Sequence, residues 1–147
     1  MKPYEKTEGD VVISDDKTRL DMAVIHAFLS GRSYWAKGVP IEIVERSIRN
    51  SLCFGMFKAG RQIGFARVVT DCATFAWLAD VFIIEEVRGD GLGKKLVAAI
   101  MAHPELQGLR RFMLGTRDAH KLYEKYGFAS LEFPERFMEF CPANRYK

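Results

Sequence analysis

The chain has 147 residues, of which 48% are hydrophobic and 28% are charged, and these values are ordinary for one globular domain. Its net charge is +3 and its longest basic runs are pairs, so the charge does not favour a nucleic-acid partner. No apolar run approaches the roughly 18 residues of a membrane span. The first ten residues, MKPYEKTEGD, do not resemble a signal peptide.

Cysteine usage indicates a reducing compartment. The three cysteines, Cys53, Cys72 and Cys141, are odd in number and widely spaced, which disfavours a disulfide framework and a zinc site. We therefore expect a single cytoplasmic domain over residues 1–147 that binds no metal, no nucleic acid and no membrane.

Hydrophobic periodicity divides the first half of the chain into one strand, two helices and a hairpin. Helical spacing of Leu20, Val24 and Phe28 marks the first helix, and Pro40 is typical of the first turn of the second. Gly60 lies in a short loop between two apolar runs, as expected for a β-hairpin. The expected elements are a strand at 11–14, helices at about 19–29 and 41–50, and strands at 52–58 and 62–70.

The second half of the chain alternates between strands and helices. A long apolar run reaches Ile84, a glycine-rich turn follows it, and Gly127 is typical of the C-terminus of a later helix. The expected elements are a strand at 74–84, a helix at 92–101, a strand at 109–116, a helix at 117–127 and closing strands at 128–133 and 136–141. This order predicts a mixed α/β domain.

The segment RGDGLG, Arg88 to Gly93, joins the strand that ends near Ile84 to the helix that begins at Leu92. Glycines in such a turn let a ligand approach the backbone, and the unpaired N–H groups of a helix start favour an anion. A P-loop would need Gly at position 88 and Ser or Thr at 95, and a dinucleotide fingerprint would need its third glycine in place of Lys94. A turn without a ligand is the simpler alternative, but three glycines flanked by basic residues exceed what a turn requires.

Two motifs resemble those of the GNAT acetyltransferase superfamily. RGDGLG is similar to the family's pyrophosphate cradle, R-G-x-G-x-G/A, and AHKLYEKYGF, residues 119–128, resembles its later A-x-x-L-Y-x-K-x-G-F segment. The run DVFIIEEV resembles the family's fourth strand, and the order of elements matches over nearly the whole chain. The resemblance implies an α/β fold with a mixed, mostly antiparallel sheet of about six to seven strands and about four helices. It also implies that the sheet is splayed between its central strands 4 and 5, here 74–84 and 109–116.

The resemblance implies acetyl-CoA as a cosubstrate. Main-chain groups at the end of the fourth strand would hold the pantetheine arm, at Val81, Phe82 and Ile83. The cradle would hold the pyrophosphate, at Arg88, Gly89, Asp90, Gly91, Leu92, Gly93 and Lys94. Thr116 stands where the family usually has Asn. It would either contact the cofactor or N-cap the following helix, and the cap is favoured.

Acetyl transfer to an amine needs a proton for the departing thiolate and a neutral amine. The resemblance assigns the first role to Tyr123, although an aromatic residue on an apolar helix stripe is also typical of a core. Tyr126 shares that stripe without the motif position, so we expect it in the core. Asp80 is the candidate base or proton relay, because a carboxylate inside an apolar strand is costly without a partner or a task. A satisfied structural Asp is the alternative.

Tyr34 and Trp35 lie in a loop between the two early helices and are candidates for the wall of the acceptor site, with anchoring of the loop as the alternative. The expected function is transfer of the acetyl group of acetyl-CoA to a primary amine, directly within a ternary complex, with a small molecule or a peptide as acceptor. A non-catalytic acyl-CoA-binding sensor or partner module is the alternative. The expected closing strand at 136–141 is compatible with a homodimer.

Overall fold

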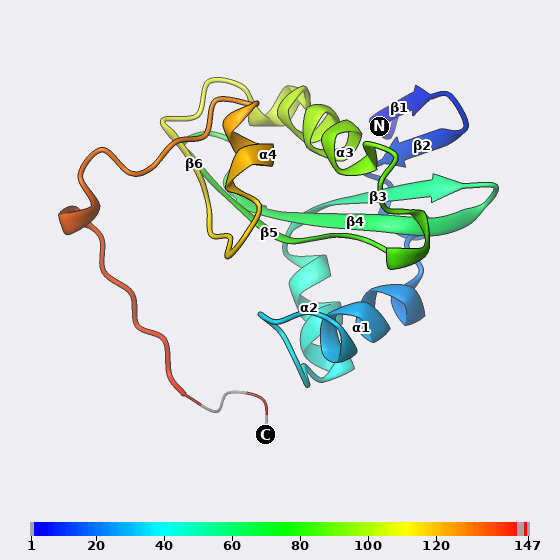
Figure 1. The fold of residues 1–147 in the computed structure, drawn as a ribbon, viewed down its shortest axis with the longest axis horizontal. Helices are drawn as coiled ribbons and strands as arrows, with labels where there is room; N and C mark the ends of the chain where they lie inside the picture. Colours follow the sequence, from blue (N-terminus) through cyan, green and yellow to red (C-terminus); the bar gives the residue numbers. More distant parts are fainter. Residues whose placement is uncertain (1, 144–145, 147) are drawn as a thin grey trace.

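The computed structural model describes residues 2–143 and 146, and its centre is a six-stranded sheet (Figure 1). The strands lie side by side in chain order, and every neighbouring pair from β1 to β5 is antiparallel, whereas β5 and β6 are parallel. Their bounds are β1 Glu5–Glu8, β2 Val11–Ser14, β3 Leu52–Lys58, β4 Arg61–Thr70, β5 Phe75–Ile83 and β6 Arg111–Leu114. The predicted mixed, mostly antiparallel sheet is therefore confirmed.

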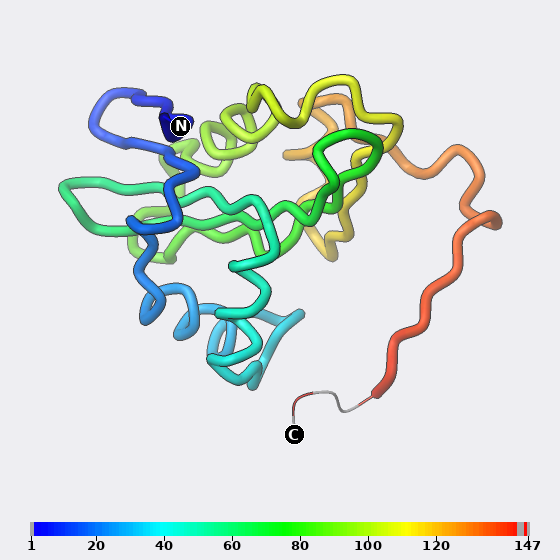
Figure 2. The backbone as a smooth tube through the Cα atoms, turned by 180° about the vertical axis from the view of Figure 1, so that it is seen from behind, coloured from blue at the N-terminus to red at the C-terminus, as the bar shows by residue number. Residues whose placement is uncertain are grey.

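Helices cover both faces of the sheet. Helices α1 (Met22–Gly31) and α2 (Ile41–Arg49) lie on one face, and α3 (Leu92–Met101) and α4 (His120–Glu124) lie on the other, as both opposite views show (Figures 1 and 2). The largest fully buried side chains come from the sheet and from the helix faces turned toward it, among them Phe54, Phe65, Ile25, Leu96 and Ile100. None of the helices in the described part of the chain has both the length and the apolar character that crossing a lipid bilayer requires.

Helix α1 begins a few residues later than predicted, because two aspartates in this region each cap a different helix. Asp16 caps a short 3-10 helix, Lys17–Arg19, by accepting a hydrogen bond from the N–H of Thr18. Asp21 then caps α1 itself, with its carboxylate accepting from the N–H groups of Ala23 and Val24 at 3.1 and 3.2 Å. The apolar spacing therefore predicted where the helix lies, whereas the Asp21 cap determines its first residue.

The splay predicted within the sheet lies between β5 and β6. Their parallel pairing ends at Leu78 and Leu114, although β5 continues to Ile83. On its other side β5 carries a bulge, because Ala66 of β4 faces both Asp80 and Val81. Asp80 adopts a φ of 55°, which is unusual for a residue other than glycine. The second half of β5 thus has an edge that β6 leaves uncovered.

Two parts of the predicted fold are wrong at the ends of the chain. Strand β1 (Glu5–Glu8) was not predicted, because all four of its residues are exposed and it has no apolar alternation. The predicted closing strands at 128–133 and 136–141 are absent from the structure, which has only a short 3-10 helix, Pro134–Arg136, in this region. A strand needs a neighbour for its ladder, and residue alternation alone does not supply one. Helix α4 is also shorter than its predicted span of 117–127.

Candidate active site

The glycine turn presents an open helix start. Gly91 is the N-cap of α3 with a φ of 71°, and Gly89 has a φ of 99°. No side chain caps this helix, and a Cβ built on either glycine would meet no atom within 4 Å. The first N–H groups of α3 therefore have no side-chain acceptor and are available to an anion, whose binding the helix dipole favours.

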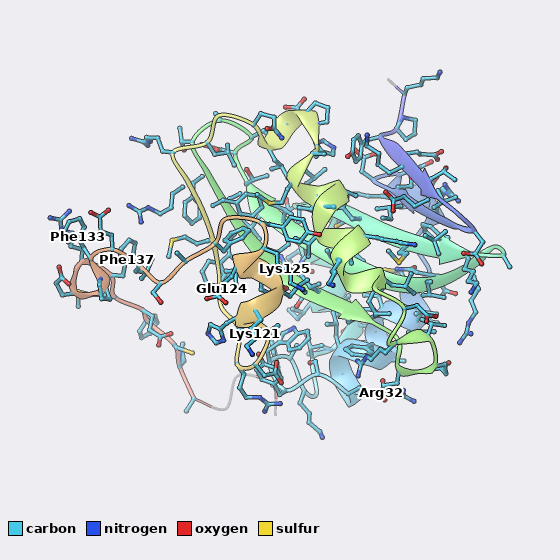
Figure 3. All side chains as sticks on the ribbon, turned by 45° about the horizontal axis from the view of Figure 1, so that its top comes forward. Arg32, Lys121, Glu124, Lys125, Phe133 and Phe137 are labelled. Atoms are coloured by element: carbon cyan, nitrogen blue, oxygen red, sulfur yellow. The ribbon has the colours of Figure 1, made fainter. Side chains whose placement is uncertain are left out.

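Two lysines from different helices add positive charge beside this helix start. The Lys94 ammonium on α3 lowers the pKa of Lys125, which lies at the C-terminal end of α4 (Figure 3), because the two like charges are neighbours. Among the described residues neither lysine forms an ion pair with a carboxylate. Lys125 was not among the predicted site residues, since only the packing of α4 against α3 brings it to the turn.

The side chains of Arg88 and Tyr126 stabilise the turn by hydrogen-bonding to the protein backbone before and after it. The Nε of Arg88 donates a hydrogen bond to the carbonyl of Ile83 at 2.9 Å, and its guanidinium lies 5.9 Å from the ring centre of Phe28. The Tyr126 hydroxyl donates to the carbonyl of Lys94 at 2.8 Å, which ties α4 to the first turn of α3. The prediction of Tyr126 as a core residue is right only in part, because its ring packs against the core while its hydroxyl serves this link.

Tyr123 lies where two cavities meet. It is only 7% exposed, and its ring packs edge-on against Phe128 with 5.9 Å between ring centres. Its hydroxyl makes no hydrogen bond to any residue that the structure describes. Burial, with a smaller contribution from Tyr34, raises the pKa of Tyr123 to about 12. The side chain therefore presents a protonated phenol whose donor is unused within the described structure.

Asp80 is held by two donors from different parts of the fold. The indole Nε1 of Trp35 donates to Oδ1 at 2.7 Å, and Nε of Arg67 donates to Oδ2 at 2.8 Å. Arg67 also donates to the hydroxyl of Ser51 at 3.1 Å. The bulge in β5 gives Asp80 its backbone conformation, and the carboxylate is nearly buried beside the splay. Both oxygens therefore accept a hydrogen bond and retain further acceptor capacity.

The loop between α1 and α2 crosses the splay through its aromatic pair. The Tyr34 hydroxyl accepts a hydrogen bond from the backbone N–H of Arg117 at 2.9 Å, and the Arg117 guanidinium lies 3.9 Å from the ring centre. Trp35 packs edge-on against Tyr34 and reaches Asp80 on the other side. Each aromatic therefore anchors the loop and also borders a cavity, and its role in the wall of an acceptor site stays a prediction.

The first cavity measures about 560 Å³ and lies beneath this aromatic bridge. Its lining brings together Tyr34, Trp35, Arg67, Trp77, Asp80 and Tyr123. Val81 and Thr116 also line it, whereas the residues of the glycine turn do not. Thr116 accepts a hydrogen bond from the N–H of Ala119 at 3.0 Å, so it caps the turn before α4 rather than the helix itself.

A second cavity of about 550 Å³ lies between β6, α4 and the segment that follows α4. Its apolar lining includes Trp77, Phe112, Leu114, Tyr123, Phe128 and Leu131. It shares Trp77, Leu114 and Tyr123 with the first cavity, so Tyr123 forms part of the boundary between the two. Within the described residues no group of three or more His, Cys, Asp or Glu side chains is arranged to hold a metal ion.

Comparison with known proteins points to one family. The model of the acetyltransferase (GNAT) domain matches residues 49–130. The chain is 32% identical over 146 residues to a proposed acetyltransferase of Gibberella zeae, with 84% of this chain and 81% of that protein covered. It is 51% identical to a crystallised, proposed GNAT acetyltransferase of Xanthomonas campestris pv. campestris, which covers 95% of this chain and 99% of its own with a TM-score of 0.91.

The fold is also shared with a more distant protein whose crystal structure contains acetyl-CoA. This GNAT family acetyltransferase of Elizabethkingia anophelis is 14% identical to the chain, with a TM-score of 0.64 and coverage of 93% of this chain and 91% of that one. At this identity the likeness concerns the fold alone.

Proposed function

Because the chain belongs to the GNAT acetyltransferase family, we propose that it moves the acetyl group of acetyl-CoA directly to a primary amine within a ternary complex. The observation that carries this proposal is the Tyr123 hydroxyl, a protonated and unused donor at the junction of two cavities beside the splay. Among the described residues no buried side-chain N or O atom lacks a hydrogen-bond partner, so this hydroxyl oxygen opens onto the cavities, where a ligand can reach it. For a catalytic acid in this place that ligand would be the departing thiolate.

The residues of the turn and of β5 fit an acyl-CoA. The open N–H groups at the start of α3 suit a pyrophosphate, and Lys94 and Lys125 supply charge that no described carboxylate neutralises. The uncovered edge of β5 suits the amide groups of a pantetheine arm, at Val81, Phe82 and Ile83. We assign the pyrophosphate to the turn as predicted, at Arg88, Gly89, Asp90, Gly91, Leu92, Gly93 and Lys94, with Arg88 bracing it. Thr116 keeps a hydroxyl hydrogen that it can donate to the same ligand.

The residues around the first cavity suit the transfer step. The neutral amine nitrogen attacks the thioester carbonyl, the carbon–sulfur bond then breaks, and Tyr123 donates its proton to the departing sulfur. The amine proton that is released leaves toward Asp80, whose two carboxylate oxygens each accept one hydrogen bond and retain a lone pair for another. Asp80 therefore acts as a relay that passes the proton on, while Tyr34 and Trp35 wall the acceptor. The acceptor class remains a small-molecule or peptide amine.

The test of this proposal is the change Tyr123→Phe, which removes the hydroxyl and keeps the ring. We expect kcat to fall roughly 10²–10⁴-fold, the range for a lost general acid, while KM for acetyl-CoA changes much less. Tyr126→Phe is the matched control, because its hydroxyl only links α4 to α3. The measurement is steady-state release of CoA thiol with a panel of amines, together with a thermal melt of each variant.

Two outcomes contradict the proposal in different ways. If both variants react at near-wild-type rates, the Tyr123 hydroxyl is not the acid and the side chain has only a packing role. Tight binding of acetyl-CoA without thiol release on any amine favours the non-catalytic binding module. In the wild-type protein we also expect no loss of rate from Tyr123 below about pH 11, because a phenol whose pKa is about 12 stays protonated there.

A further inference from the structure

Four aromatic side chains around the first cavity are each left partly exposed. Their exposed fractions are 46% for Tyr34, 37% for Trp35, 38% for Trp77 and 37% for Tyr146. Large apolar side chains that gather around one hollow and stay open to water are typical of a ligand-binding site. These four rings therefore offer apolar surface to a ligand in the cavity, which measures about 560 Å³.

Tyr146 comes to this cavity from the far end of the chain. The segment after α4 first extends away from the sheet in two opposite views (Figures 1 and 2). Tyr146 nevertheless lies against the loop between α1 and α2, since a Cβ built on Gly38 would be 3.4 Å from the Tyr146 carbonyl oxygen. The same loop carries Tyr34 and Trp35. Tyr146 was not among the predicted site residues, and the tertiary structure alone places it in the cavity wall.

The charged side chains in the wall of the first cavity form two opposite pairs. Among the described residues that line it, the charged ones are Arg67, Asp80, Arg117 and Asp118. Arg67 donates to the Asp80 carboxylate at 2.8 Å, and the Arg117 guanidinium lies 3.9 Å from the Asp118 carboxylate. Each of these charges has a partner of opposite sign, so the wall has no net charge with which to bind an additional charged group of a ligand.

A wall of balanced charge disfavours several classes of amine. The carboxylate of an amino acid or the phosphate of an amino sugar phosphate needs a free cation, and the second ammonium of a polyamine needs a free anion. An ionised group that leaves water without such a partner is costly. An apolar group has no such requirement, and it gains free energy by covering the aromatic rings.

We propose that the acceptor bound in the first cavity is a monoamine with an aromatic or apolar body and no other charged group. This inference rests on the proposed acetyl transfer. The body lies among the four aromatic rings, and the amine nitrogen lies next to Asp80, whose oxygens retain acceptor capacity. In the transfer the nitrogen gives up one hydrogen and gains the acetyl group, and the products are a neutral amide and the thiol of CoA.

The test compares amines that differ by one group. 2-Phenylethylamine and phenylalanine differ by a carboxylate, hexylamine and 1,6-diaminohexane differ by a second amine, and ethylamine has no large body. Calorimetric titration of each amine into the protein saturated with CoA measures binding without turnover. We expect 2-phenylethylamine and hexylamine to bind roughly 10- to 100-fold more tightly than the other three, the range for burying one large apolar group.

Variants of Tyr146 test whether this residue determines specificity. Tyr146→Ala should weaken the binding of 2-phenylethylamine roughly tenfold, whereas Tyr146→Phe should leave it near the wild-type value, because only the ring is used. Phe75→Ala is the matched control, because Phe75 is 38% exposed and does not line the first cavity. A thermal melt and a titration with CoA check that each variant is folded.

The possible failures are distinguishable. Equal affinity for the two members of either matched pair of amines would overturn the inference, as would an equal loss of affinity in Tyr146→Ala and Phe75→Ala. Release of CoA thiol with the amines that carry a further charge, and not with the monoamines, would overturn the acceptor class and leave the proposed acetyl transfer intact. Selective binding of the monoamines without thiol release on any amine would overturn the acetyl transfer and support the preference of the cavity.

Discussion

The glycine turn at the start of α3 and the first cavity beside the splay are built from different chemical groups. The turn offers backbone N–H groups at the start of α3 and has no side chain over Gly89 or Gly91. The cavity is bordered by side chains that already hold one another, since Trp35 and Arg67 both donate to Asp80. Changes to backbone shape should therefore damage cofactor binding, whereas changes to hydrogen-bonding side chains should damage use of the acceptor.

The largest effect is expected from Gly91→Val. A branched side chain at a φ of 71° both strains the turn and enters the open space beside the first amides of α3. Loss of one or two charge-assisted hydrogen bonds would weaken CoA binding by roughly 100-fold or more, measured by calorimetric titration. Gly60→Val is the matched control, because Gly60 has a φ of 76°, open space around it and a place in a distant hairpin. Equal affinity for CoA in both folded variants would remove the turn from the cofactor site.

An intermediate effect is expected from Trp35→Phe. This change keeps an aromatic wall and removes the indole donor to Asp80. A hydrogen bond to a charged group is worth about 1.5 kcal/mol or more, so kcat/KM for the amine should fall roughly tenfold. Affinity for CoA should not change. The control is Trp77→Phe, since Trp77 borders the same cavity and its indole donates to no described residue. A larger loss in the control than in Trp35→Phe would contradict the role given to the Asp80 contact.

The smallest effect is expected from Lys125→Ala. Its ammonium is exposed, so removing it should weaken CoA binding only about two- to fivefold at low salt. The difference from wild type should shrink as salt rises, because exposed charges are screened. Lys121→Ala is the control, because Lys121 is an exposed lysine on the same helix (Figure 3). The measurement is titration with CoA at two salt concentrations. An equal loss of affinity in both variants would contradict a specific role for Lys125.

Local sequence was sufficient for the elements whose signals are continuous along the chain. Helix α3 begins and ends at the predicted residues, because a glycine turn at one end and a regular apolar face need no distant partner to be recognised. Helix α2 agrees within one residue because Pro40 precedes it. The residues predicted for the glycine turn and the position of Tyr123 were likewise predicted from two short motifs.

Contacts between distant segments were not predictable by these means. The sequence identified Asp80 as a costly carboxylate, but not its two donors, which lie 45 and 13 positions away. Lys125 reaches the glycine turn only because α4 packs against α3. The apolar residues at 136–141 likewise did not form a strand, because no neighbouring strand pairs with them.

The sequence by itself determined the order of strands and helices from β2 to α4, the glycine turn and the motif tyrosine, because each depends on residues close together in the chain. The tertiary structure alone decided the splay, the hydrogen bonds around Asp80, the approach of Lys125 to Lys94 and the course of the chain after α4. These features depend on which surfaces meet after packing. A strand needs a neighbouring strand for its hydrogen bonds, and the interaction between two charges depends on the distance that the fold sets between them.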